Sequence, residues 1–357
     1  MPSLAMYNRE IVVFPGTICR RNSRNLQVRS CRLANLRSSG GSLSGKGSND
    51  VIRSLFITIF LPTIVIVAAC GLWACERPQD PGTVAGEEIP EMDVFLVDIR
   101  SDGAVPTLGP PRNVTSRPGY DNQPVFLPDS AGFLFTSWVD MQADTCRYDI
   151  GTEAIERVTA STSGEWAPAL TPDGQGFTIS RDEPEGYQRL WRFPMSGRSL
   201  GVVLRDVTGA GYHTWVDSDT IALYMLAEPP QLALVDVDTE ERRIVASGVG
   251  RCIQRVPGRR ELAFVDKSNP EAWVIRYLDL ETMRTSRAVP ATAGSEDFAI
   301  GIDGSILMGE GARLFRYPSG GSDWELLGDW SHLLSGSITR IALSPTGRHM
   351  AIVVKES

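Results

Sequence analysis

The sequence predicts an all-β fold, a six-bladed β-propeller with four antiparallel strands in each blade. Three observations support this fold class. A turn of the Pro-Asp-Gly type recurs at a nearly constant interval, a second polar corner recurs between these turns, and short apolar or alternating segments flank both kinds of corner. Repeats of paired hairpins with hardly any helical periodicity are typical of propellers, in which each repeat forms one radial sheet.

The Pro-Asp turns define the repeat. The clearest copy is "LTPDGQGFTIS" at residues 170–180, in which a tight turn separates two apolar segments. Turn residues of this kind supply the reversed backbone of a hairpin, and the flanking pattern is that of buried or half-buried strands. Successive turns are separated by steps of 44, 44, 41, 45 and 43 residues, which is too regular for chance. The six turns begin at Pro128, Pro172, Val216, Pro257, Ile302 and Pro345.

The second corner lies between successive Pro-Asp turns. Its clearest copy is "CRYDIGTEAIERVT" at residues 146–159, and an additional copy at Val94–Thr115 precedes the first Pro-Asp turn. Six copies of each hairpin predict four strands per unit. The propeller segment, residues 93–357, opens with an outer hairpin and closes at Val354 with an inner one, so its two ends are expected to complete the last blade together. This arrangement leaves no edge strand unpaired.

The residues before the propeller differ in composition. Residues 1–50 are basic and rich in Ser, Arg and Gly, and they predict a disordered segment. An alternative hypothesis is that translation begins at Val51, so that residues 1–50 are never made. Residues 76–92, rich in Pro, Gly and Glu, are expected to form a linker.

Residues 51–75 predict contact with a membrane. They contain "SLFITIFLPTIVIVAACGLWAC", 22 residues without a charge, which as a helix would reach across a bilayer core of about 30 Å. One interpretation is a spanning anchor whose basic flank stays in the cytoplasm. The other is a signal peptide, because "VAAC" at Val67–Cys70 resembles the lipobox of bacterial lipoproteins. In that interpretation Cys70 is the acylated residue. The later "LWAC" fits less well because Trp73 is bulky.

Composition excludes several classes of partner and site. The net charge of -8 and the pI near 5.1 argue against nucleic acid as the main partner, since phosphate binding needs a basic surface. The six cysteines form no Cys-x-x-Cys pair and no His stands at a metal-ligand spacing, so neither a metal site nor a cofactor is predicted. Cys146 and Cys252 are expected to be buried as small hydrophobic residues.

The repeats resemble those of the TolB-like propeller family, a group with WD40-like repeats that carry the Pro-Asp turn. The resemblance is strongest at Leu127–Ser137, Leu170–Ser180 and Leu343–Val354 and extends over about residues 93–357. It implies a location in the cell envelope and a scaffold role. The best known member has an additional α/β domain before its propeller, for which this chain has no room, so that member's partners are not carried over.

Candidate binding residues follow from the expected architecture. The innermost strand of each blade lines the axis of a propeller, and the residues just before that strand ring one mouth of the channel. Arg251 and Arg340 there could recognise a carboxylate, and Trp166 or Tyr212 could stack on a ligand. The alternative is that these positions are polar only because channel mouths are wet. The candidates are Asp121, Glu165, Trp166, Tyr212, His213, Arg251, Asp297 and Arg340.

The sequence therefore predicts a propeller anchored to a bacterial envelope membrane, on its extracytoplasmic side, that binds a protein, peptide or glycan. A lyase or cyclotransferase with its site at the channel mouth is the alternative, and a purely structural propeller is a third. No catalytic residue is predicted, because propeller enzymes usually assemble several His and carboxylates on the axis and the chain has only three histidines.

The acylation hypothesis predicts that Cys70→Ser abolishes incorporation of a fatty acid analogue into the protein during growth, because the thiol is the acceptor of the lipid. The measurement is in-gel detection of the labelled protein in cells that express the wild type, Cys70→Ser or Cys75→Ser. Cys75→Ser is expected to remain labelled. Label retained in Cys70→Ser would exclude this cysteine as the lipid acceptor.

Overall fold

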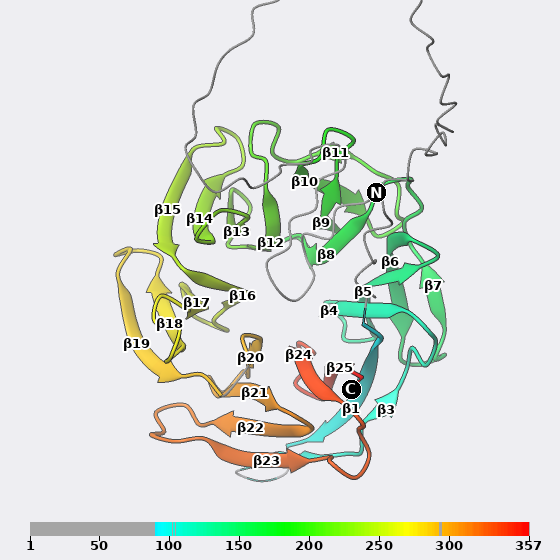
Figure 1. Ribbon diagram of the computed structural model, residues 1–357, viewed down its shortest axis with the longest axis vertical. Coiled ribbons are helices and arrows are strands. Elements are labelled where there is room, and N and C mark those ends of the chain that lie inside the picture. The colour runs from blue at the N-terminus through cyan, green and yellow to red at the C-terminus, as the bar shows by residue number, and fades with distance from the viewer. Residues whose placement is uncertain (1–89, 102, 104, 293–294, 357) are drawn as a thin grey trace, which may run out of the picture. The chain divides into compact units, whose positions relative to one another are not determined.

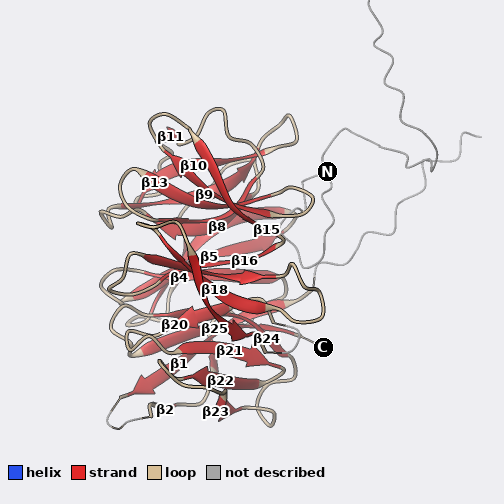
Figure 2. Ribbon diagram, turned by 90° about the vertical axis from the view of Figure 1, so that its left-hand side faces the viewer, coloured by secondary structure: helices blue, strands red, loops and turns tan. Residues whose placement is uncertain are grey.

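A computed structural model describes residues 90–356 of the chain apart from 102, 104 and 293–294. The chain divides into two compact units, and the described residues belong to the one that includes Glu88–Ser357. They form strands and loops with no helix among them, as Figure 2 shows. The all-β prediction is confirmed. No helix in this described part is long and apolar enough to cross a membrane. The predicted basic segment, the apolar segment with Cys70 and most of the linker lie outside the described residues.

Four of the five sheets are four-stranded and antiparallel, and they are arranged around a common centre (Figure 1). Each is one continuous stretch of chain. In chain order their strands are β8 (Glu165–Leu170), β9 (Gly176–Asp182), β10 (Gln188–Pro194) and β11 (Gly201–Val202); β12 (Ala210–Trp215), β13 (Thr220–Met225), β14 (Gln231–Asp236) and β15 (Arg242–Ser247); β16 (Val249–Arg255), β17 (Glu261–Asp266), β18 (Val274–Asp279) and β19 (Thr285–Pro290); and β20 (Phe298–Ile300), β21 (Ile306–Glu310), β22 (Arg313–Tyr317) and β23 (Glu325–Asp329).

The fifth sheet has nine strands and contains both ends of the described chain. Its order is β24-β25-β1-β4-β5-β6-β7, with β2 and β3 also pairing with β1. The contact between β1 and β4 is limited to one parallel pair, Met92 with Tyr120. The strands are β1 (Met92–Arg100), β2 (Thr107–Leu108), β3 (Arg112–Asn113), β4 (Tyr120–Phe126), β5 (Gly132–Val139), β6 (Gln142–Asp149), β7 (Ile155–Arg157), β24 (Ser337–Leu343) and β25 (His349–Lys355).

The predicted pairing between the ends of the chain is present. β1 pairs antiparallel with β25 over seven residues, from Met92 opposite Lys355 to Asp98 opposite His349. The outer hairpin predicted at Val94–Thr115 differs in one respect, because its second arm consists of the two short strands β2 and β3. Pro106, Pro110 and Pro111 account for this, since proline has no backbone N–H to donate to a strand ladder.

All six predicted Pro-Asp turns lie between two antiparallel strands. Gly174, Gly304 and Gly347 in these turns have positive φ angles of 67°, 76° and 67°, which glycine adopts without strain. The strands that start each hairpin are β4, β8, β12, β16, β20 and β24, and each contacts the next in this order, with β24 returning to β4. They surround the centre of Figure 1. These six are called the inner strands below.

Three of the second corners are closed by the same kind of side-chain hydrogen bond. In "DIGT", "DVDT" and "DLET" the Asp carboxylate accepts a hydrogen bond from the backbone N–H three residues later, at Thr152, Thr239 and Thr282. These bonds are 2.7–2.8 Å long and lower the pKa of each Asp. The carboxylates of "DVDTEE" at residues 236–241 therefore belong to a hairpin corner.

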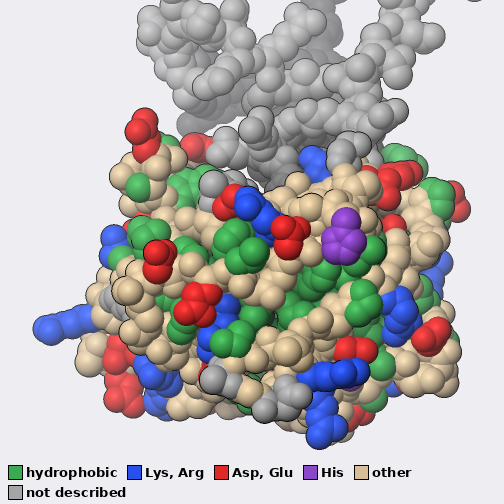
Figure 3. All heavy atoms as spheres, turned by 90° about the horizontal axis from the view of Figure 1, so that it is seen from below, with side chains coloured by type: hydrophobic (Ala, Val, Ile, Leu, Met, Phe, Trp, Pro, Cys, Tyr) green, Lys and Arg blue, Asp and Glu red, His purple; other side chains and the backbone are tan. Residues whose placement is uncertain are grey.

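Burial follows the position of each strand in its sheet. The middle strands are almost fully buried, with Phe133, Phe177 and Phe264 among the largest enclosed side chains. The outermost strands β7, β15 and β23 are largely exposed. On the face drawn in Figure 3, acidic and basic side chains are interspersed with hydrophobic ones. Cys146 and Cys252 are buried and unpaired, as predicted.

Packing beside the β1–β25 pair should dominate stability. Ile352 of β25 is fully buried opposite Phe95, so Ile352→Ala is expected to lower the free energy of unfolding by about 2–5 kcal/mol. Leu326→Ala on the outermost strand β23, where the side chain is 56% exposed, should change it by less than about 0.5 kcal/mol. Urea unfolding of the full-length variants measures both, and equal effects would contradict this assignment of the core.

Candidate functional site

The inner strands are irregular near their starts. Five of the six, β4, β8, β12, β16 and β24, shift register there against the next strand of the sheet. Within two of these shifts a non-glycine residue has a positive φ angle, 61° at Gln123 and 51° at Ala167. Register shifts of this kind bend a strand and redirect its side chains, and they are common beside functional sites. Except for Asp297, which precedes the regular strand β20, the predicted mouth residues lie within or next to these irregular segments.

Charged side chains from three sheets form a continuous series at the start of the inner strands. Lys267 Nζ lies 3.3 Å from Glu296 Oε2, and Glu296 Oε1 lies 2.9 Å from Arg251. Arg251 also pairs with Asp297, whose other oxygen Oδ1 lies 3.6 Å from Arg340. The signs alternate from Lys267 to Arg340. We call these five residues the charge chain; with three cations and two anions it carries a net charge of +1.

The arginines of the charge chain stay ionised despite their burial. Burial lowers the pKa of Arg251, but the carboxylates of Asp297 and Glu296 raise it more, so that the pKa lies well above its usual value. Arg340 follows the same pattern. Burial lowers its pKa, but Asp297 and Tyr212 raise it more, so that the pKa is higher than usual. Both guanidinium groups are therefore fixed positive charges.

Aromatic and amide side chains border the Arg340 end of the charge chain. The Arg340 guanidinium lies 5.0 Å from the centre of the Tyr212 ring, a distance typical of a cation–π contact. Gln123 Nε2 donates to the Tyr212 hydroxyl at 3.4 Å, and Gln123 Oε1 accepts from the Ala167 backbone N–H at 2.7 Å. Gln123 thus connects β4, β8 and β12.

The remaining candidates contact residues outside the charge chain. Tyr212 contacts Arg340, whereas the next residue, His213, contacts Thr178 of β9. Asp121 bonds to Arg117 at 2.8 Å, in the loop before β4. Burial raises the pKa of Asp121, and the Arg117 and Ser137 hydrogen bonds offset part of this.

Trp166 is held by its neighbours. Its ring Nε1 donates to Asp182 at 3.0 Å, and its ring contacts those of Trp138 and Tyr120 edge to face at centroid distances of 5.2 and 6.2 Å. The residue is almost fully buried. Little of the indole face predicted to stack on a ligand is therefore accessible.

His213 is a buried neutral imidazole. Its Nε2 lies 2.7 Å from the Thr178 hydroxyl, which also accepts a hydrogen bond from Trp215. Burial lowers the pKa of His213 to about 3. His213 is therefore uncharged at neutral pH, and its contact with Thr178 joins β12 to β9.

Glu165 is the least compensated carboxyl group among the described residues. It is 0% exposed, and neither carboxyl oxygen has a hydrogen bond of normal geometry. Burial raises its pKa, and the nearby hydroxyls of Thr159 and Ser161 counter this only in part. A protonated Glu165 avoids the cost of an unpaired buried charge.

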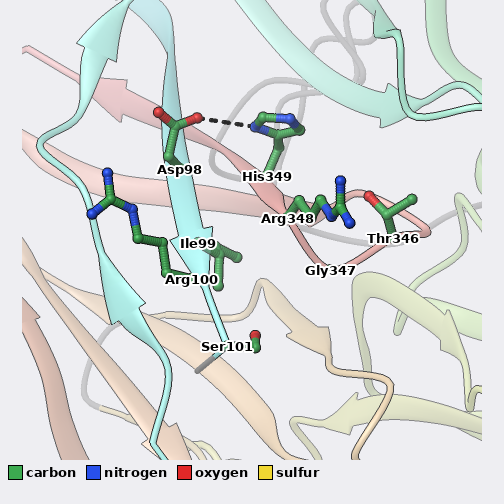
Figure 4. Close-up of a pocket in the computed structure, with 8 residues that line it drawn as sticks. All are labelled: Asp98, Ile99, Arg100, Ser101, Thr346, Gly347, Arg348 and His349. Atoms are coloured by element: carbon green, nitrogen blue, oxygen red, sulfur yellow. Dashed lines mark hydrogen bonds and ion pairs between the residues drawn. The ribbon is translucent and has the colours of Figure 1, made fainter. Parts of the chain in front are cut away.

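A shallow pocket lies apart from the charge chain, on β1 and the turn between β24 and β25. It has a volume of about 590 Å³ and is open to solvent. His349 places its Nδ1 3.0 Å from Asp98, while Arg100 and Arg348 also line the pocket (Figure 4). The His349–Asp98 contact bridges the two terminal strands.

The described residues hold no group of three or more His, Cys, Asp or Glu side chains placed to bind a metal ion.

The sequence analysis placed Tyr212, Arg251, Asp297 and Arg340 in one group, and these four residues do lie in one cluster. It missed Gln123 and Lys267. Gln123 stands 44 residues before Ala167, so the repeat period itself could have indicated the equivalence of their unusual backbone conformations. Lys267 follows β17, outside the aligned positions, and left no such signal.

Solved structures share this fold. A protein from Agrobacterium tumefaciens described as TolB matches with a TM-score of 0.60 at 16% identity, over 75% of this chain and 99% of that one. A chain of the nidogen–laminin complex matches with a TM-score of 0.52 at 10% identity, over 71% and 98%. A gluconolactonase from Xanthomonas campestris matches with a TM-score of 0.52 at 8% identity, over 72% and 94%.

These similarities confirm the TolB-like propeller fold and, at such identities, nothing more specific. No protein-family model matches the chain, and no curated protein sequence matches it significantly.

The state of Glu165 predicts an unusual pH dependence. Because burial raises its pKa in the folded protein, the protonated group stabilises the fold at low pH, and this contribution is lost as the pH rises through the folded-state pKa. Glu165→Gln, which cannot ionise, should therefore gain stability over the wild type as the pH rises, by about 1–3 kcal/mol.

Urea unfolding of full-length wild type and Glu165→Gln at pH 4.5 and pH 8 measures this gain. The exposed Glu185→Gln is the matched control. A Glu165→Gln variant that is less stable than the wild type at pH 8 would mean that the ionised carboxylate is stabilised by the fold.

Proposed function

We propose that this protein is a six-bladed propeller that binds a protein, peptide or glycan in a bacterial cell envelope through the end of the ring that carries the charge chain. The observation that carries the proposal is the convergence of Arg251, Asp297 and Arg340, from three separate sheets, on one partly accessible cluster. Charged groups buried this far are costly unless they are paired, and a net charge left over favours an oppositely charged ligand.

Six blades account for the pairing pattern. The nine-stranded sheet is held together at its middle by the single pair Met92–Tyr120, so we assign β24-β25-β1-β3 to one blade and β4-β5-β6-β7 to another. The six inner strands, each in contact with the next, support the same count. The blade that contains both chain ends would then be the one that completes the ring.

The anchoring assignment is part of the proposal and depends on the sequence. The apolar segment at residues 54–75 and the lipobox ending at Cys70 support a lipoprotein, or otherwise a spanning anchor, with the propeller of residues 93–357 on the extracytoplasmic side. The likeness to a protein described as TolB fits such a location. Neither membrane of the envelope is favoured.

A binding role suits the site better than catalysis does. Glu165 and His213 have perturbed pKa values of the kind found in active sites, yet both are buried, and the hydroxyls beside them belong to residues outside the charge chain. A catalytic acid or base must reach its substrate. A rigid ring, by contrast, presents fixed side chains to a partner with little loss of conformational entropy on binding. Because a gluconolactonase has the same fold, an enzymatic function is the alternative.

Alanine at both Arg251 and Arg340 is expected to abolish recovery of the envelope partner. The measurement is in vivo cross-linking of the full-length, membrane-bound protein followed by mass spectrometry. The control replaces the exposed arginines Arg259 and Arg313, which lie outside the charge chain, and should keep the same partners. A set of partners unchanged by the Arg251/Arg340 substitution would indicate that the charge chain only stabilises the fold.

A further inference from the structure

We infer that the charge chain binds a carboxylate group and that Arg340, not Arg251, is the residue that contacts it. This inference rests on the proposed binding function and names the chemistry of the ligand. It follows from how differently the two guanidinium groups are satisfied within the fold.

Arg251 is occupied by the protein itself. Its two terminal nitrogens reach two different carboxylates, with Nη1 on Glu296 and Nη2 on Asp297. An arginine fork that already holds two acidic side chains has its charge balanced locally. Arg251 is therefore a positioning residue that fixes Asp297.

Arg340 is not satisfied in this way. Its only ion pair within the described part of the chain is with Asp297 Oδ1, at 3.6 Å, and no described acceptor hydrogen-bonds to its guanidinium. Its other contact is a cation–π contact with the Tyr212 ring, which does not replace a hydrogen-bond acceptor for the N–H groups of the guanidinium. A buried donor without an acceptor costs free energy that a ligand can recover.

The charge balance identifies the ligand as an anion. The charge chain alternates in sign from Lys267 to Arg340 and ends on a cation at both ends, so one positive charge is unmatched. At the other end of the charge chain, Lys267 makes a cation–π contact with the Trp273 ring at 4.4 Å. Its side chain is also about twice as exposed to water as that of Arg340. The excess charge is therefore least compensated at Arg340.

Access and geometry favour a carboxylate. The Arg340 side chain keeps 14% of its surface exposed, whereas that of Asp297 keeps 2%, so Arg340 is the more accessible of the two to a ligand. A planar group with two oxygens matches the paired N–H donors of arginine. The carboxylate could belong to a peptide, as its C-terminus or an acidic side chain, or to a sugar acid, and the chemistry of the contact is the same.

The experiment is a titration of the ¹⁵N-arginine-labelled full-length protein, followed by the Nε–H resonances of its arginines. The probes are acetyl-glycyl-glycine with a free carboxylate, the same peptide with a C-terminal amide, glucuronate, and the methyl ester of glucuronate. A saturable shift with either acid, together with no shift from its neutral partner, is the expected result. Which acid binds more tightly identifies the source of the carboxylate.

Three variants locate the contact. Arg340→Ala should weaken acid binding roughly ten- to hundred-fold, the usual effect of losing a charge-assisted hydrogen bond, and Arg340→Lys should retain part of it. Asp297→Asn removes the competing internal carboxylate and should strengthen acid binding several-fold. Damage to the fold would weaken binding, so an increase in affinity would not be explained by it. Arg313→Ala, an exposed arginine paired with Glu310, is the control and should bind as the wild type does.

Equal shifts with the acids and their neutral partners, or acid binding that survives in Arg340→Ala, would overturn the inference. So would weakening by Asp297→Asn in a variant that unfolds at the wild-type temperature. If neither acid binds, the inference fails, and the cross-linking experiment on the membrane-bound protein then decides separately whether the proposed binding function still stands.

Discussion

The pairing of β1 with β25 is the constraint on which the rest of the fold depends. It joins residues about 250 positions apart into one antiparallel ladder of seven residue pairs. The entropy lost in bringing such distant segments together must be regained by buried contacts, and Val94, Ile352 and Val353 in this ladder are all fully buried. The His349–Asp98 contact lies at one end of the same ladder.

The charge chain is a consequence of this arrangement. Its residues come from β16, from β24, from the segment before β20 and from the end of β17, and no two adjacent sheets could hold them together alone. Because each inner strand contacts the next, the starts of these strands are held at fixed positions. Arg251, Asp297 and Arg340 then lie at distances that local sequence does not determine. A binding site built this way is rigid before any ligand arrives, which limits the entropy lost on binding.

Sequence alone predicted the repeat well because its signals are local. A Pro-Asp-Gly turn needs only its own residues to reverse the chain, and the corner formed by Asp236 and Thr239 is closed by a bond between residues three apart. Spacing then places the strands, including those on either side of the turns at Val216 and Pro257. The same reasoning correctly grouped Tyr212, Arg251, Asp297 and Arg340, since all stand near the start of an inner strand.

What sequence could not predict depends on register and on contacts between sheets. Glu165 and His213 stand at the expected positions, but their neighbours are Thr159 and Ser161 for Glu165 and Thr178 for His213, and none of these belongs to the charge chain. Lys267 joins the charge chain through Glu296, a contact between two loop residues 29 positions apart in sequence that no motif marks. The exposed surface of Trp166 was likewise overestimated, because its partners Asp182 and Trp138 come from two different sheets.

Hydrogen exchange of β1 tests the central claim most directly. Amides of Met92–Arg100 and of His349–Lys355 would be followed in the full-length protein as urea is added below the unfolding transition. The pairing of the two strands predicts that both segments are strongly protected and that they lose protection together, at the free energy of global unfolding. Rapid exchange of Met92–Arg100 while His349–Lys355 remains protected would show that the N-terminal strand is not an integral part of the fold, and would contradict the account.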